Sequence, residues 1–254
     1  MVVSYAFGDS SDAARRLAVV HRVFVPLAER VLHDVVHRPP GVVADLGCGP
    51  GCTTRFLAER WPDAEVIGVD ASATFLAAAT SQAPRARFVR GDVTDGGALP
   101  AGCADVVYAR CLLAHIADVA GAIATWCSWL ASDGRLVLEE PERIDTDDPV
   151  FRAYIAATGR AVAARGATMR AGPLVARATA SLHGVVLNRV EPHAVATSDA
   201  ATMFALNLAT IGNDPAAGLD AATTSMLASE LALRQEDRRS GAITWHVRQV
   251  AVAR

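Results

Sequence analysis

The chain has 254 residues, of which 52% are hydrophobic and 20% are charged, a composition that supports a packed core and excludes extended disorder. A formal net charge of −3 argues against a nucleic-acid partner, because proteins that bind a phosphate backbone usually present a basic face. The sequence shows neither a signal-peptide pattern nor an apolar run long enough to span a membrane, so we expect a cytoplasmic protein without a membrane partner.

The first predicted element is an amphipathic helix over residues 12–36, which a turn of two prolines and a glycine follows and Pro26 could break. Short apolar strands bounded by turn residues then alternate with helices. The predicted strands are 42–46, 64–69, 87–90, 105–109 and 135–139, and the predicted helices between them are 51–60, 72–81 and 119–130. This alternation is typical of an α/β fold with a doubly wound, mostly parallel sheet.

Beyond Pro141 the regular alternation gives way to a more helical region. The predicted helices there are 150–165, 197–211 and 221–238, the late strands are 185–190 and 243–252, and residues 166–174 are expected to form a loop or lid. We therefore expect one domain over residues 1–254. Its parts are an N-terminal helical cap (1–40), a ligand-binding core (41–140), substrate-side insertions and helices (141–240) and the last strand (241–254).

Three glycines follow the first predicted strand within the segment VVADLGCGPGCTT. Glycine inside an element costs about 0.5–1 kcal/mol relative to alanine, so Gly47, Gly49 and Gly51 indicate a geometric demand. In open parallel sheets, ligands bind beyond the carboxyl ends of the strands, where the N–H groups of the next helix can meet an anion. The sequence therefore predicts a ligand site at this turn.

Acidic residues fall at the same edge of the predicted sheet. Asp70 ends the second predicted strand, where a carboxylate can accept hydrogen bonds from ribose hydroxyls, and Asp92 follows the third. A dinucleotide site needs the pattern G-x-G-x-x-G, but Cys52 occupies the position of its last glycine. Asp45 would place negative charge beside a cationic ligand group, which favours an ammonium and a sulfonium over a pyrophosphate. An NAD-dependent oxidoreductase is kept as an alternative.

These motifs occur in register with those of a known family. DLGCGPG, GVD and GDV, followed by DVVYARCLLAHIAD and SDGRLVLEE, resemble the class I (Rossmann-like) S-adenosylmethionine-dependent methyltransferases over roughly residues 42–140. The beginning, YAFGD with the AARRL helix, resembles actinobacterial small-molecule members that act in specialised metabolism. The resemblance implies a seven-stranded sheet with an antiparallel last strand, S-adenosyl-L-methionine as cofactor and S-adenosyl-L-homocysteine as product.

The resemblance also implies which residues bind the cofactor. They are Asp45, Gly47, Cys48, Gly49, Gly51, Asp70, Ala71, Asp92, Val93 and Arg110. In this assignment the glycine turn and Asp45 hold the methionine part, and Asp70 accepts hydrogen bonds from the ribose. Asp92 accepts a hydrogen bond from the adenine amino group, Val93 faces the ring, and Arg110 supplies part of the pocket wall.

Methyl transfer from a sulfonium mainly requires that a nucleophile be held in line with the C–S bond. A base is needed only where the acceptor must lose a proton. His115 is the candidate for that base or for an orienting residue, with a histidine bonded to a nearby carbonyl as the alternative. Strand alternation lets only one of Glu139 and Glu140 face the pocket, and we favour Glu140 for a catalytic role.

Four residues outside the core are candidates for lining the substrate pocket, namely Tyr5, His21, Met169 and Phe204. For His21, a packed or exposed helix histidine is the alternative. No metal is expected, because the carboxylates of residues 139–145 suit a solvated turn and the five cysteines, read as free thiols, lack paired zinc spacing.

The expected partner is a small-molecule methyl acceptor. We expect a specialised metabolite, for which an aromatic or indole-like compound is one option. Whether O, N or C receives the methyl group stays open, as does a homodimer. A second alternative is a relative that binds the cofactor without methyl transfer, either as a cyclase or as a regulatory protein.

Overall fold

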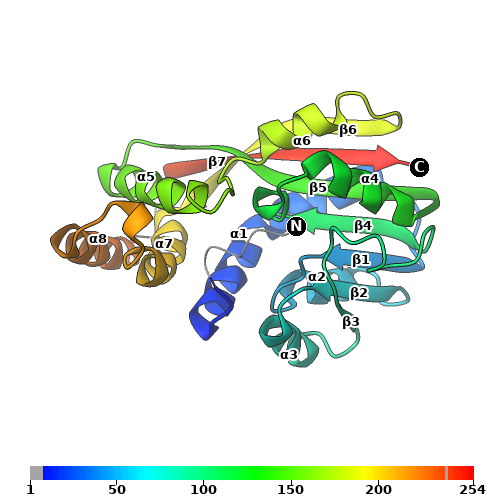
Figure 1. Cartoon of the computed structure of the whole chain (residues 1–254), viewed down its shortest axis with the longest axis horizontal. Coiled ribbons are helices and arrows are strands. Elements are labelled where there is room, and N and C mark those ends of the chain that lie inside the picture. The colour runs from blue at the N-terminus through cyan, green and yellow to red at the C-terminus, as the bar shows by residue number, and fades with distance from the viewer. Residues whose placement is uncertain (1–7, 238–239) are drawn as a thin grey trace.

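A seven-stranded sheet in the order β3-β2-β1-β4-β5-β7-β6 forms the centre of the computed structural model, which describes residues 8–237 and 240–254 (Figure 1). The parallel strands are β1 (Val42–Leu46), β2 (Glu65–Asp70), β3 (Arg87–Arg90), β4 (Ala104–Arg110) and β5 (Leu130–Thr146). The last strand, β7 (Ser240–Ala253), runs antiparallel to both β5 and β6 (Val185–Ala196). The expected doubly wound, mostly parallel sheet with an antiparallel last strand is confirmed.

The register of the sheet brings the ends of three strands together at one edge. Leu46 of β1 pairs with Val69 of β2 and with Ala109 of β4. The residues that follow these three strands therefore emerge side by side, at the edge where open parallel sheets bind their ligands.

Helices pack on both faces of this sheet. The helices α1 (Ser11–Val35) and α2 (Cys52–Arg60) bury apolar side chains against one face, and α4 (Val119–Trp129) and α6 (Gly172–Thr179) against the other. α3 (Ala73–Gln82) follows β2. Trp126 and Trp129 of α4 are fully buried, as expected for residues that fill a core.

The long α1 helix is continuous, so Pro26 does not break it. Ser10 caps its first turn by accepting a hydrogen bond from the Ala13 amide at 3.2 Å. A proline inside a helix removes one hydrogen bond and costs about 3 kcal/mol. Leu27 and Val31 beyond it are almost completely buried, and this burial offsets the loss.

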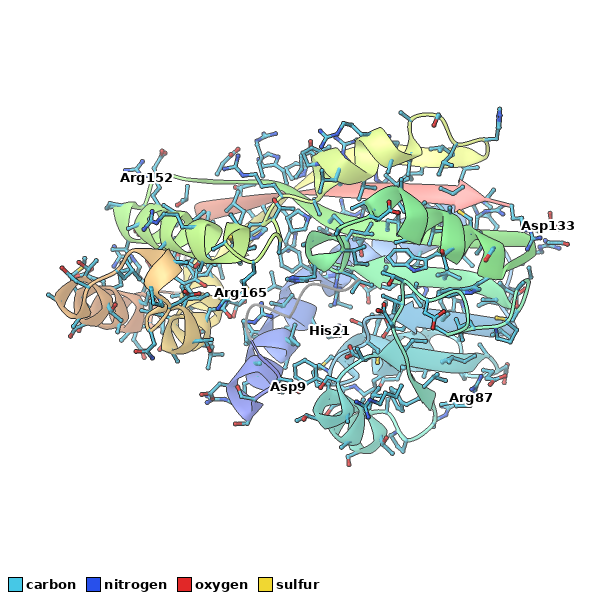
Figure 2. All side chains as sticks on the ribbon, in the orientation of Figure 1. Asp9, His21, Arg87, Asp133, Arg152 and Arg165 are labelled. Carbon is cyan, nitrogen blue, oxygen red and sulfur yellow. The ribbon has the colours of Figure 1, made fainter. Side chains whose placement is uncertain are left out.

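A second group of helices lies beyond the carboxyl end of β5 and the amino end of β7, away from β1, β2 and β3 (Figure 1). It consists of α5 (Pro149–Ala163), α7 (Thr197–Ile211) and α8 (Ala221–Arg234), with the short turn η2 (Pro215–Ala217). Its apolar side chains pack against one another, against β7 and against Phe24 and Leu27 of α1. Figure 2 shows Asp9, just before α1, and His21 of α1 between this helical group and the sheet.

Several predicted boundaries are wrong, among them the end of β6, which lies at Ala196 rather than at residue 190. β5 extends to Thr146 instead of ending at residue 139, because β7 pairs with it along the added length. The expected loop over residues 166–174 instead leads into α6, which begins at Gly172. The last helix, α8, ends at Arg234 rather than at residue 238.

All five cysteines are free thiols, as expected. Among the residues that the structure describes, none of the helices has the length and apolar character that crossing a membrane requires.

Candidate active site

A cavity of about 630 Å³ opens at the edge where β1, β2 and β4 end. From the glycine turn it continues past α1 to α5, α7 and β7. Its volume lies within the range of roughly 300–1,000 Å³ that small-molecule sites usually have. One cavity therefore joins Gly47, Gly49 and Asp70 to a second compartment, which residues of α5, α7 and β7 line.

The glycine turn has a left-handed backbone at all three glycines, with φ of +62° at Gly47, +53° at Gly49 and +88° at Gly51. A Cβ on Gly47 would lie 2.6 Å from Leu112 Cδ1, and one on Gly51 would lie 2.9 Å from the Cα of Ala79. Gly47, Cys48 and Gly49 line the cavity, whereas Gly51 precedes α2 and packs against α3. Gly51 thus supports the turn and does not face the cavity.

Asp70 is one of the carboxylates in the cavity wall, at the end of β2. Its Oδ2 accepts a hydrogen bond from the Gly49 amide and its Oδ1 accepts one from the Ser72 amide, each at 2.8 Å. Burial raises the pKa of this carboxyl above its ordinary value, although the two amides oppose the shift. Ala71 and Ser72 line the cavity beside it. The arrangement fixes the carboxylate and leaves lone pairs for a ligand's hydroxyl groups.

Asp45 and Asp92 were expected to bind the cofactor, but neither side chain lines the cavity. Asp45 is buried beneath the turn, where its Oδ2 accepts a hydrogen bond from the Thr54 hydroxyl at 2.6 Å. Burial raises the pKa of Asp45 to about 7, while the Thr54 bond acts in the opposite direction. Asp92 turns its Oδ1 to the amide and hydroxyl of Thr94, at 2.8 and 2.7 Å. Its neighbour Val93 lines the cavity.

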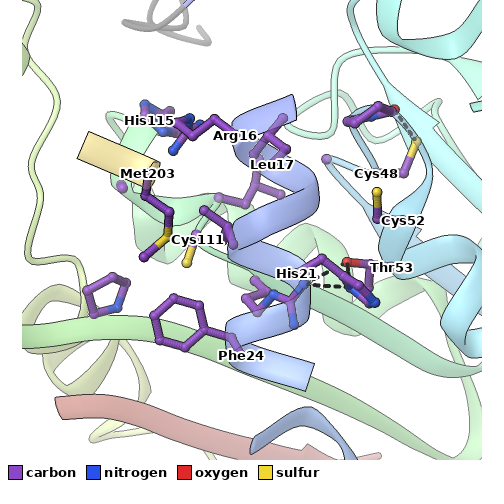
Figure 3. Close-up of a pocket in the computed structure, with 18 of the residues that line it drawn as sticks. Arg16, Leu17, His21, Phe24, Cys48, Cys52, Thr53, Cys111, His115 and Met203 are labelled. Atoms are coloured by element: carbon purple, nitrogen blue, oxygen red, sulfur yellow. Dashed lines mark hydrogen bonds between the residues drawn. The ribbon is translucent and has the colours of Figure 1, made fainter. Parts of the chain in front are cut away.

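Arg110, at the end of β4, connects α1 to the first turn of α2. Its Nη2 donates to Thr53 Oγ1 at 2.9 Å and to His21 Nδ1 at 3.2 Å, and Figure 3 shows His21 turned toward Thr53. Its Nη1 is buried without a hydrogen-bond partner in the described part of the chain. Burial, with the charges of Arg110 and Arg55, lowers the pKa of His21 to about 4. His21 is therefore a neutral hydrogen-bond acceptor in the cavity wall.

The turn after β4 carries His115 on the short helix η1 (Leu113–His115). His115 lines the cavity, and burial together with the charge of Arg16 lowers its pKa to about 4. Figure 3 shows Arg16 and His115 next to each other. Cys111 at the start of this turn has φ of +53°, a conformation that side chains other than glycine seldom adopt.

The choice between the two adjacent glutamates is the reverse of the one expected: Glu139 lines the cavity and Glu140 does not. Both oxygens of Glu139 accept hydrogen bonds, one from the Tyr108 hydroxyl and the other from Gln249 Nε2 at 2.7 Å. The Oε1 of Glu140 accepts from the amides of Leu112 and Leu113, at 2.7 Å each. Burial raises the pKa of Glu140 to about 8. Glu140 therefore holds the turn that carries His115.

The second compartment is lined by side chains that the sequence analysis mostly missed. Of the residues expected to line the substrate pocket, Met169 and Phe204 line the cavity, whereas Tyr5 lies outside the described residues. The lining residues that were not proposed include Arg16, Tyr154, Asn207, Trp245 and Val247. Alternation in the last strand puts Trp245 and Val247 on one face, but this pattern does not reveal what the face meets.

No group of three or more metal-ligating side chains occurs within residues 8–237 and 240–254. Among the described residues, the cavity wall combines backbone amides, three carboxylates including that of Asp70 at the end of β2, two guanidinium groups and two neutral imidazoles.

Comparison with known proteins places this site in a family context. Residues 43–134 match the family model described as a methyltransferase domain. A trans-aconitate 2-methyltransferase of Rhodopseudomonas palustris is 34% identical over 129 residues, which cover 51% of this chain and 50% of that protein. The chain spans about half the length of the curated relatives that it matches.

Solved structures share the fold at low sequence identity. A geranyl diphosphate methyltransferase superposes with a TM-score of 0.56 at 17% identity, over 100% of this chain and 87% of that one. The [4+2]-cyclase SpnF superposes with a TM-score of 0.57 at 18% identity, over 89% and 80% of the two chains. Residues 43–134, which include the glycine turn, Asp70 and Arg110, are therefore similar to a methyltransferase domain, and the chain shares the Rossmann-like fold of these solved structures.

Proposed function

We propose that this protein transfers a methyl group from S-adenosyl-L-methionine to a small organic acceptor. The observation that carries the proposal is the continuous cavity, which joins the glycine turn and Asp70 to a largely apolar compartment between α1 and α7. The cofactor supplies a methyl group already activated by its sulfonium. The remaining tasks, which are to bind, to orient and to exclude water, fall to residues of this chain.

The residues at the sheet edge fit this cofactor. The Asp70 carboxylate, fixed by two amides, suits a pair of ribose hydroxyls. The buried Nη1 of Arg110 has no partner in the structure described, and a carboxylate such as that of the methionine part would satisfy it. Gly47 and Gly49 let a ligand approach the backbone, and Val93 supplies an apolar contact beside Asp92 for the adenine.

On the acceptor side, His115 is the candidate for orienting the nucleophile. With a pKa of about 4 its imidazole is neutral at pH 7, so that a ring nitrogen can accept a hydrogen bond from the acceptor. The same low pKa makes it a weak general base, which favours orientation over proton removal. Glu140 acts through the backbone of η1 and is a positioning residue in this proposal.

The acceptor class is supported by the compartment and by the relatives. Trans-aconitate is the substrate named for the similar bacterial enzymes, which supports a small organic molecule as acceptor here. The apolar wall extends the proposal to specialised metabolites of aromatic or similar character. S-adenosyl-L-homocysteine is then the product that leaves the site.

Calorimetry tests the proposal by measuring the binding of S-adenosyl-L-methionine, S-adenosyl-L-homocysteine and NAD to the full chain. We expect the first two to bind and NAD not to bind. Asp70→Asn should weaken binding by roughly 10- to 100-fold, because a neutral amide accepts weaker hydrogen bonds from hydroxyls. Asp133→Asn changes an exposed carboxylate far from the cavity and is the matched control (Figure 2).

Mass spectrometry of a panel of candidate acceptors then looks for the mass gain of one methyl group. Methyl transfer to any acceptor supports the proposal. Failure of the natural chain to bind S-adenosyl-L-methionine would overturn it. Cofactor binding with no transfer across a broad panel would favour a cyclase or a regulatory binding protein.

A further inference from the structure

The second compartment of the cavity has an aromatic wall. Phe204 of α7 stacks on Tyr154 of α5, with ring centroids 4.1 Å apart and planes inclined by 20°. The ring centroid of Trp245 of β7 lies 5.9 Å from that of Phe204 and 6.0 Å from that of Phe24 of α1. All four rings line the cavity, and each is at most 6% exposed. This wall offers flat apolar faces to a ligand.

A polar group lies within this apolar wall. Asn207 follows Phe204 by one helical turn on the cavity side of α7, and it is 8% exposed. The Tyr154 hydroxyl is buried without a hydrogen-bond partner in the described chain. Thr158 and Asn207 lie beside it and oppose the rise that burial causes in its pKa. Buried polar groups are rarely left unsatisfied, so this end of the compartment suits a ligand that brings its own hydroxyl or carbonyl group.

The charges around the cavity do not suit a highly anionic acceptor. Among the described residues that line it, the cationic side chains are Arg16 and Arg110. Arg110 Nη2 donates to Thr53 and His21, and in the proposed function its Nη1 pairs with the carboxylate of the cofactor, so Arg110 is not left for the acceptor. Asp9, Asp70 and Glu139 line the same space with carboxylates. The two histidines in the wall, with pKa values of about 4, are neutral at pH 7. A tricarboxylate would therefore lose its hydration without gaining matching positive charge.

We infer that the acceptor compartment selects a flat, uncharged molecule that carries a hydroxyl or carbonyl group, and that it rejects tricarboxylates. The ring of this molecule lies against Phe204 and Trp245, and its polar group hydrogen-bonds to Asn207 and to the Tyr154 hydroxyl. The inference rests on the proposed function, since it describes the acceptor for the same cavity. It assigns Asn207 and Tyr154 as specificity-determining residues.

Calorimetry with three probes tests this inference on the full chain, with and without saturating S-adenosyl-L-homocysteine. The probes are 2-naphthol, naphthalene and trans-aconitate. We expect 2-naphthol to bind about tenfold more tightly than naphthalene, and trans-aconitate not to bind. The comparison isolates one hydroxyl on the same flat frame.

Two variants separate hydrogen bonding from general damage to the fold. Asn207→Leu has nearly the same volume, and Tyr154→Phe removes only the hydroxyl, so each should reduce the preference for 2-naphthol while leaving S-adenosyl-L-homocysteine affinity unchanged. Asn213→Leu, at an exposed position after α7, is the matched control and should keep the preference.

Each outcome of the titrations bears on the inference. Equal binding of 2-naphthol and naphthalene to the natural chain would overturn it, as would an undiminished preference in both variants. Binding of trans-aconitate without binding of 2-naphthol would also overturn it. Failure of S-adenosyl-L-homocysteine to bind contradicts the proposed function instead, while the probe titrations without it still decide the inference.

Discussion

Replacing Glu140 with glutamine should make the stability of this protein less sensitive to rising pH. Glu140 is 1% exposed, and its Oε1 accepts hydrogen bonds from the Leu112 and Leu113 amides. Its Oε2 is buried without a partner in the described chain, and burial raises its pKa from the ordinary 4.5 to about 8. Glutamine keeps an acceptor oxygen for both amides and cannot ionise.

The magnitude follows from the two pKa values of Glu140. Below pH 4.5 the carboxyl is protonated in the folded and the unfolded chain, so its contribution is fully present. Between pH 4.5 and about 8 the unfolded chain loses this proton while the folded chain keeps it, so stability falls as pH rises. At 1.36 kcal/mol per pH unit, the loss approaches roughly 4–5 kcal/mol near pH 8. The glutamine variant avoids this loss.

Urea unfolding at pH 5 and pH 8 measures the effect as the difference in unfolding free energy between Glu140→Gln and the natural chain. That difference should shift in favour of the variant by several kcal/mol between the two pH values, on the order of the loss just derived. Glu59→Gln, at a side chain 70% exposed on α2, should show a nearly constant difference and is the matched control. A constant difference for Glu140→Gln as well would refute the reasoning, because the carboxyl would then titrate alike in both states.

Three further predictions concern the turn, the buried glutamate and metal dependence. Gly47→Ala should destabilise the fold by about 1–2 kcal/mol and weaken cofactor binding, since its φ is +62° and its Cβ would clash with Leu112. Thermal unfolding measures this against Gly96→Ala, where a Cβ meets open space; equal shifts would contradict the prediction. Tyr108→Phe should cost about 1–3 kcal/mol in urea unfolding, because Glu139 loses a buried donor, and an unchanged midpoint would refute that role. EDTA should leave the proposed methyl transfer unaffected, because the sulfonium already activates the methyl group; loss of activity that a divalent ion restores would contradict this prediction.

The sequence by itself determined the core of the fold and the place of the site. Alternating short strands and helices predict a parallel sheet, and such a sheet brings the residues after its strands to one edge. The glycine turn, Asp70, Arg110 and His115 consequently share the cavity, although 68 residues of sequence separate Gly47 from His115 (115 − 47). Local pattern was sufficient because the topology of the sheet turns sequence order into spatial order.

Only the tertiary structure decided which of Glu139 and Glu140 faces the cavity and where β5 ends. Strand alternation allowed either Glu139 or Glu140 to face the cavity. The two amides that donate hydrogen bonds to Glu140 belong to a turn 27 and 28 residues earlier in the chain. The length of β5 likewise depends on β7, whose pairing partners lie about a hundred residues away. The residues around Glu140 and β5 do not indicate that the turn after β4 and the strand β7 pair with them.

The acceptor compartment also came only from the tertiary structure. Its rings come from α1, α5, α7 and β7, and each of them reads locally as an ordinary core residue of its own element. Helical and strand periodicity show which face of an element is apolar, but not whether that face meets another element or an open cavity. The cofactor side follows from strand order, which the sequence encodes locally, whereas the acceptor side depends on how distant elements pack.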